Sequence, residues 1–242
     1  VAQWFNGFID EVRISNVART AQEIAESYRL GRDHYLNRTI SSTDLSNQSL
    51  IGFDVASDQP GTNLEFTYGE SAFANGQPDA STVGLWHLEE GNESSYTNES
   101  TASTSWLRDS SSNSNHGRLG DGANDADATI PTPTSSGITG QARSFDGSND
   151  LIRIADNATL DFAAANSFSL EAWVKHDGAI ASNPDYILTK ADTTTGGYKL
   201  YMDNSGDFCF AVDDDSSWTP DDSACTSAID YDDSKWHHVV GV

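Results

Sequence analysis

The sequence predicts an all-β protein, an antiparallel β-sandwich with one short helix near the N-terminus. Strand-like runs recur through the second half of the chain, and Ser, Thr, Asn, Asp and Gly fill the stretches between them. A helical repeat of apolar residues occurs only near the beginning. Strands at this spacing, without intervening helices, are typical of a sandwich or jelly roll.

The first predicted elements are a strand and the helix that follows it. Residues 8–14 alternate apolar and other residues, which would place four side chains on one face: Phe8, Asp10, Val12 and Ile14. Thr20 and Glu23 have the spacing of a capping box, and apolar residues then repeat at helical spacing up to Gly31. A short amphipathic helix should therefore end at Gly31.

Residues 32–82 show no clear periodicity, and we expect an irregular spacer there. The segment is too long for an ordinary loop inside a compact domain, which favours a boundary between two units. The second unit begins with a strand at 83–88. Its later strands are expected at 142–145, 151–154, 168–175, 186–190, 198–202, 207–212 and 236–240.

The charge of the chain excludes some partners. Thirteen basic against 37 acidic residues give a formal net charge of -24, which repels nucleic acid and anionic lipid surfaces. No apolar run is long enough to span a membrane, so membrane insertion is not expected. The sequence starts without methionine and stops inside a strand-like run, which suggests a segment of a longer polypeptide.

The two cysteines, Cys209 and Cys225, flank an acidic, turn-rich loop between two candidate strands. This placement suits a disulfide across a hairpin, which would imply an oxidising compartment. Two buried free thiols remain the alternative. Metal binding by this pair alone is disfavoured, because no further Cys or His lies at ligand spacing.

Four motifs occur in the order found in one family of domains, at residues 109–117, 140–150, 168–175 and 235–239. Together they resemble the laminin-G-like (concanavalin A-like) jelly roll found in tandem in bacterial surface proteins. The final strand of that family resembles residues 5–14, which here stand first.

The resemblance implies a division of the chain into three parts. Residues 1–31 would be the C-terminal strand and helix of a preceding domain, and residues 83–242 the N-terminal and central part of a second, truncated domain. The strands between the motif at 235–239 and the final strand are missing. Without them, the second unit should expose sheet edges and part of its core.

The resemblance also implies a structural calcium ion, with Asp109 and Asn115 as ligands and Asp10 supplied by the final strand. The competing interpretation of Asp109 is an aspartate that caps a turn.

Ligand-binding residues are expected on loops and exposed aromatics. Asp146 and Asp150 lie in a turn between two strands, although turn chemistry alone also explains them. Aromatic residues near turns or strand ends could stack on sugar rings: Tyr186, Tyr198, Tyr201 and Trp218.

No pair of carboxylates lies at the spacing that glycoside hydrolases of this architecture use, so we expect no catalytic residues and no enzyme activity. We expect an extracellular or cell-surface adhesion module that binds a glycan or a protein and adjoins further repeats. The alternatives are an architectural repeat without a ligand and an accessory domain of a polysaccharide-degrading enzyme.

Overall fold

The computed structural model describes residues 4–38, 77–89, 106–121, 128–163, 165–178, 184–192, 196–214, 220–227 and 231–242. These residues form antiparallel sheets, an α-helix and one short 3-10 helix, η1 (Ala158–Leu160). The predicted all-β class is confirmed. The predicted spacer falls mostly on residues 39–76, which lie outside the described residues.

One layer is a six-stranded sheet with the order β13-β8-β1-β6-β5, in which β2 also pairs with β1. Its strands are β1 (Asn6–Ser15), β2 (Thr82–Trp86), β5 (Thr132–Thr134), β6 (Ala142–Asp146), β8 (Ser169–His176) and β13 (His237–Gly241). The apolar runs predicted these strands to within one or two residues, except β5, whose Thr-Pro-Thr sequence has no strand signal.

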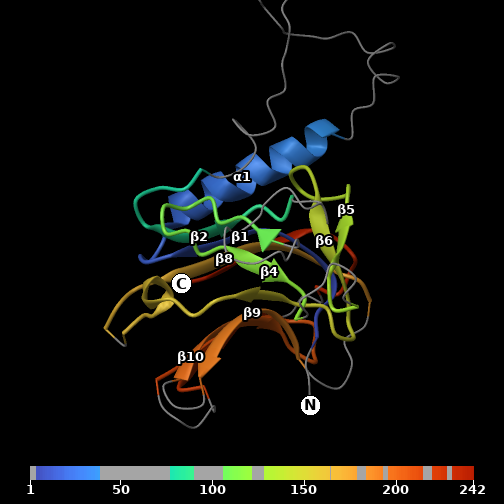
Figure 1. Ribbon diagram of the computed structural model, residues 1–242. Helices are drawn as coiled ribbons and strands as arrows, with labels where there is room; N and C mark the ends of the chain where they lie inside the picture. The colour runs from blue at the N-terminus through green and yellow to red at the C-terminus, as the bar shows by residue number, and fades with distance from the viewer. Residues whose placement is uncertain are drawn as a thin grey trace, which may run out of the picture.

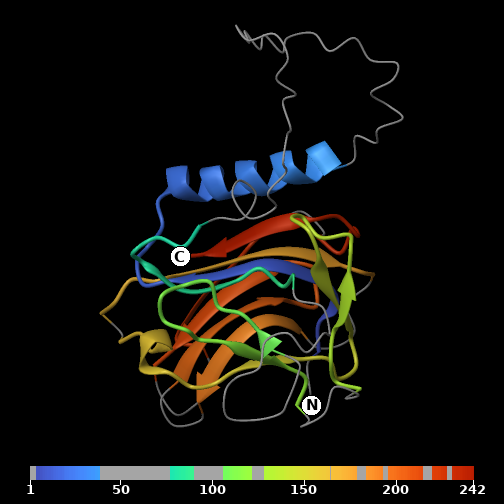
Figure 2. The same cartoon turned by 45° about the horizontal axis from the view of Figure 1, so that its top comes forward.

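The opposite layer consists of two smaller sheets with the orders β12-β11-β10-β9 and β3-β4-β7. Their strands are β3 (Trp106–Leu107), β4 (Gly117–Leu119), β7 (Ile152–Ile154), β9 (Asp185–Asp192), β10 (Gly196–Met202), β11 (Phe208–Asp213) and β12 (Asp222–Cys225). Figures 1 and 2 show β9 and β10 curving across the side of the six-stranded sheet that is opposite the helix.

Strand β1 lies inside the six-stranded sheet and not in a separate unit. Ile9 pairs with Val174 of β8 and with Arg143 of β6, and Val12 pairs with Trp86 of β2. Residues 6–15 therefore share one sheet with strands β2, β5, β6, β8 and β13, whereas the sequence suggested that the two parts belong to different domains. That residues 1–31 are the tail of a preceding copy in a longer polypeptide stays a prediction.

A bulge at Glu11 changes which side chains of β1 face the core. The register shifts between Asp10 and Arg13, and Glu11 has a φ of 49°. Ile9 and Ile14 both enter the core, while Phe8 packs on the other face near Trp236. The prediction that residues 8, 10, 12 and 14 share one face is therefore wrong, because an extra residue reverses the alternation.

Helix α1 (Ala21–Arg38) covers the outer face of the six-stranded sheet (Figures 1 and 2). The predicted capping box is present, since Thr20 N donates to Glu23 Oε2 at 2.7 Å and Glu23 N donates to Thr20 Oγ1 at 3.3 Å. The helix continues past Gly31, where we expected it to end. Gly31 lies against the Trp173 ring, a close approach that explains a glycine inside the helix.

The core between the two layers is incompletely filled between strands β7 and β9. Strands β7 and β9 have no hydrogen-bonded strand between them among the described residues, and both border a cavity of about 2090 Å³. Lys190 of β9 bridges to the segment that follows β7, with Nζ 2.8 Å from Asp156 Oδ1 and 2.7 Å from Asp161 Oδ1. Exposed sheet edges and a partly open core were expected from the sequence.

Candidate functional site

The outer face of the β9–β12 sheet carries the candidate ligand-binding surface. Along β10, alternate residues Tyr198, Leu200 and Met202 are buried in the core between the layers. Lys199 and Tyr201 consequently point to the opposite, outer face. Tyr198 and Tyr201 therefore lie on opposite faces of β10, Tyr198 in the core and Tyr201 on the outer face.

Two tyrosines and a lysine form a cluster on this face. The rings of Tyr186 and Tyr201 meet edge to face at a centroid distance of 6.1 Å. The Lys199 ammonium lies 5.5 Å from the Tyr186 centroid and 5.4 Å from the Tyr201 centroid. Burial lowers the pKa of Lys199, against the opposing charge of Asp213. Lys199 is 7% exposed, so the half-buried rings of Tyr186 and Tyr201 are the accessible part of the cluster, and the ammonium lies against both rings.

The predicted aromatic residues separate into different environments. Tyr186 and Tyr201 are half-buried on the outer face. Tyr198 is 4% exposed and donates its hydroxyl hydrogen bond to the Leu160 carbonyl at 3.2 Å, so its prediction as a ligand-stacking residue is wrong. Trp218 lies outside the described residues. Lys199 was not predicted, although its place between two tyrosines on a strand is a usable signal.

Asp146 and Asp150 close the turn between β6 and β7. Asp150 is buried and its Oδ2 accepts a hydrogen bond from Asp146 N at 2.9 Å, while Asp146 Oδ1 accepts from Ser148 N at 2.8 Å. Burial raises the pKa of the Asp150 carboxyl. These contacts match the turn interpretation, and they place neither residue beside the tyrosine cluster.

Asp109 and Asn115 lie together in one loop, as expected. Asp109 Oδ1 accepts from Leu85 N at 2.9 Å and Ser111 N at 2.8 Å, and its Oδ2 accepts from Ser111 Oγ at 2.7 Å and Asn115 N at 2.8 Å. Both oxygens of this carboxylate are thus occupied by protein donors. The donor set fits a turn-capping aspartate, and it leaves little capacity for calcium.

Asp10, the third expected calcium ligand, binds a different segment. Its Oδ2 accepts from Ile138 N at 2.7 Å and Thr139 N at 3.1 Å, and no hydrogen bond or ion pair joins it to Asp109 or Asn115. Burial and then the charge of Glu11 raise the pKa of Asp10. The predicted triad is therefore not assembled as one set of contacts.

Two further carboxylates surround the segment that Asp10 binds. Glu11 Oε1 accepts from Thr139 Oγ1 at 2.6 Å, and a Cβ placed on Gly140 would lie 2.2 Å from Glu89 Oε1. Asp10 itself is fully buried. Protein donors occupy these carboxylates too, since Asp10 Oδ1 accepts from Glu11 N at 2.9 Å and the two Glu11 oxygens lie 3.0 and 2.9 Å from His87 Nδ1. The carboxylates of Asp10, Glu11 and Glu89 therefore have no advantage over Asp109 as a calcium site.

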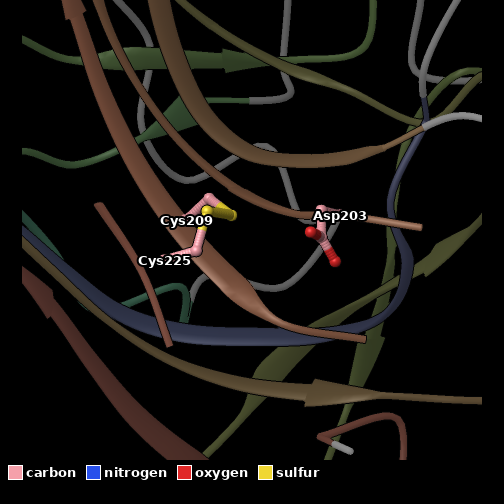
Figure 3. A group of neighbouring side chains, drawn as sticks. All are labelled: Asp203, Cys209 and Cys225. Carbon is pink, nitrogen blue, oxygen red and sulfur yellow. A yellow bond between two sulfur atoms is a disulfide. The ribbon is translucent and has the colours of Figure 1, made fainter. Parts of the chain in front are cut away.

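The predicted disulfide between Cys209 and Cys225 is confirmed. It joins β11 and β12 at directly opposed positions, with a Cα–Cα distance of 4.1 Å. Cys209 also lies opposite Tyr201 in the β10–β11 register, so the disulfide adjoins the tyrosine cluster. Figure 3 shows Asp203, which follows β10, beside the two sulfur atoms.

No helix in the described part of the chain has the length and apolar character needed to span a membrane. Comparisons with curated proteins and with solved structures give no match. Residues 146–242 match the laminin-G model of the concanavalin A-like lectin/glucanases superfamily. This match confirms the resemblance over residues 146–242, which contain the motifs at 168–175 and 235–239.

Proposed function

We propose that this chain is a non-catalytic, glycan-binding module of a larger exported protein, and that it binds through the outer face of the β9–β12 sheet. The observation that carries the proposal is the cluster of Tyr186, Lys199 and Tyr201. Tyrosine rings offer flat apolar faces to the C–H side of a sugar ring, and the buried Lys199 ammonium contacts both rings and so helps to orient them.

The position of the cluster supports this choice of face. Helix α1 covers the outer face of the six-stranded sheet through Tyr28 and Gly31, which both pack on Trp173. The inner faces of the layers pack on each other. No helix of the described residues covers the outer face of β9–β12 (Figure 2).

The charge of the chain narrows the class of glycan. A formal net charge of -24 repels sulfated and uronic acid-rich polymers at long range. The single positive charge of Lys199 does not offset the negative electrostatic potential of the whole chain. We therefore propose a neutral polysaccharide or oligosaccharide as the ligand.

The disulfide supports a location outside the cytosol. The Cys209–Cys225 bond persists in oxidising surroundings, which are found outside the cytosol. An extracellular or cell-surface location, with further repeats on either side, is consistent with that chemistry and with the superfamily.

We further propose that this chain binds the structural calcium ion that the resemblance implies, through the carboxylate of Asp109 with Asn115, or through that of Asp10. Asp109 is 3% exposed and Asp10 is fully buried, so a bound cation would offset a negative charge that burial disfavours.

Binding to immobilised neutral polysaccharides tests the ligand. Tyr186→Ala and Tyr201→Ala should each weaken binding by up to about tenfold, because a packed aromatic ring contributes on the order of 0.5–1.5 kcal/mol. Tyr28→Ala is the matched control, since Tyr28 is exposed on α1 at the other side of the sandwich. Equal binding by all three variants, or no binding by the unmodified chain, would contradict the proposal.

Thermal unfolding in calcium and in excess chelator tests the ion separately. Calcium should raise the melting temperature of the unmodified chain, and the variant among Asp109→Asn and Asp10→Asn that loses this response identifies the ligand. An unmodified chain with the same melting temperature in calcium and in chelator would contradict the proposal.

A further inference from the structure

Asp203, Cys209 and Cys225 bring three metal-ligating groups together on the outer side of the β10–β12 strands. One carboxylate oxygen and the two Sγ atoms all lie within 4.8 Å of one another, and this is the group of three such ligands found in the described residues (Figure 3). No sequence pattern pointed to the third ligand, because Asp203 belongs to the turn before β11.

The aspartate is fixed in place by its own turn. Asp203 Oδ1 accepts from Ser205 N at 2.8 Å and from Asp207 N at 3.1 Å, and Asp203 N donates to Asp207 O at 2.9 Å. Both side-chain bonds use Oδ1, so Oδ2 keeps its lone pairs for another ligand. A carboxylate held in this way loses little conformational freedom when it binds a metal ion.

The two cysteines are fixed by the sheet. Cys209 of β11 and Cys225 of β12 are directly opposed in the strand register. Cys209 is 1% exposed, whereas Cys225 is exposed on the edge strand of the sheet. A reductant therefore reaches the bond from the Cys225 side, and the register keeps the two sulfur atoms adjacent after the bond has broken.

We propose that the reduced form of this protein binds a zinc-like divalent cation through the thiolates of Cys209 and Cys225 and the Asp203 carboxylate. A dithiol or phosphine reductant supplies two electrons, the S–S bond breaks, and two protons are taken up to give two thiols. Metal binding then releases both protons, because thiolates are the ligands.

The donor set selects the class of metal. Two thiolates and one carboxylate are soft and borderline donors, which suit tetrahedral zinc or cobalt with a water molecule as the fourth ligand. Calcium and magnesium prefer all-oxygen sites. This site is therefore distinct in chemistry from the carboxylates around Asp10.

The oxidation state of Cys209 and Cys225 then determines whether a disulfide or a metal complex forms. In the disulfide, the sulfur atoms have no thiolate charge to donate, so the oxidised chain should not hold the ion here. In the reduced chain, the bound metal occupies both sulfurs and should slow re-formation of the disulfide. The site is an alternative cross-link between β11 and β12 under reducing conditions.

Cobalt(II) titration of the reduced, full-length chain under anaerobic conditions tests the proposal. Thiolate-to-cobalt charge-transfer absorption and the intense visible bands of tetrahedral cobalt should appear with the reduced chain and be absent with the oxidised chain. Asp203→Asn should weaken cobalt affinity about tenfold or more, in the range seen when metal-site partners are lost. Asp222→Asn, which removes the same charge from exposed β12, should leave the affinity unchanged.

Two measurements keep the result interpretable. Near-ultraviolet circular dichroism of the reduced chain establishes that it is folded before metal is added, and the same titration in denaturant gives the affinity of the unfolded thiols. The proposal is overturned if Asp203→Asn binds cobalt as tightly as the unmodified chain. It is also overturned if a folded, reduced chain binds no more tightly than the denatured one.

Discussion

Glu171 of β8 and His238 of β13 form a buried hydrogen-bonded pair beneath helix α1. Glu171 Oε1 lies 2.8 Å from His238 Nε2, and their side chains are 7% and 4% exposed. Arg19 Nε lies 3.5 Å from the other carboxylate oxygen. Burial alone would raise the pKa of Glu171, but His238, Arg13 and Arg19 outweigh it and hold this pKa below the ordinary value of 4.5.

This pair predicts acid sensitivity that depends on Glu171. A carboxyl whose pKa is lowered by folding stabilises the native state above its unfolded pKa, and that contribution is lost as the pH falls through the folded pKa. Stability should therefore drop below about pH 4.5. Glu171→Gln should be less stable at pH 7 and should lose part of this drop, as measured by urea unfolding across pH. If the free energy of unfolding of Glu171→Gln falls with decreasing pH as steeply as that of the unmodified chain, other carboxyls cause the acid sensitivity.

Gly31→Ala should loosen the contact of α1 with the sheet. A Cβ at this position would lie 2.7 Å from Trp173 Nε1, and the Trp173 ring is held between Tyr28 and His238. Replacing glycine by alanine in a free helix stabilises it by about 1 kcal/mol. Here we expect a net loss of about 1–2 kcal/mol from overpacking, together with a change in tryptophan fluorescence.

The sign of the change in stability caused by Gly31→Ala tests whether α1 depends on its contact with Trp173. Gln22→Ala, at an exposed position of the same helix, should have a small effect and no change in fluorescence. If Gly31→Ala stabilises the chain, then α1 does not depend on close contact with Trp173.

Local pattern predicted the longer strands because apolar runs bounded by turn residues determine where such strands form. Local pattern also predicted the capping box, because Thr20 and Glu23 lie three residues apart in the sequence. It failed at β5 and β12, whose Thr-Pro-Thr and Asp-Ser-Ala-Cys sequences carry no apolar pattern. These short strands exist because neighbouring strands supply their hydrogen-bond partners.

The candidate sites were harder to predict because they combine distant parts of the chain. The disulfide could be predicted, since both cysteines flank one loop. Asp203 could not, because its place beside the cysteines depends on the register of β10 and β11, and the pairing of Lys199 with both Tyr186 and Tyr201 depends on the register of β9 and β10 as well. The face of Asp10 was misread because a single bulge at Glu11 reverses the alternation, and no propensity marks that bulge.

Asp109→Ala should be among the most destabilising substitutions in the loop regions. Asp109 is 3% exposed and accepts hydrogen bonds from three backbone amides and the Ser111 hydroxyl. Each buried donor left without a partner costs about 1–3 kcal/mol, so we expect a loss of about 3 kcal/mol or more in chemical denaturation. Asp146→Ala removes an aspartate from an exposed turn and should cost about 1 kcal/mol or less. Similar losses for the two variants would contradict a structural role specific to Asp109.

Removing the Cys209–Cys225 disulfide should lower stability without unfolding the chain. The cysteines are separated by 16 residues, and closing a loop of this length stabilises the native state by about 3 kcal/mol in the chain-entropy model. The double variant Cys209→Ala, Cys225→Ala should lose about that amount in urea unfolding. The unmodified chain treated with a phosphine reductant should lose a similar amount, because both treatments free the same loop. A much larger loss in the double variant would mean that the Cys209 side chain also matters for packing, since it is 1% exposed. If neither treatment changes stability, the sheet already fixes β12 against β11 without the covalent bond.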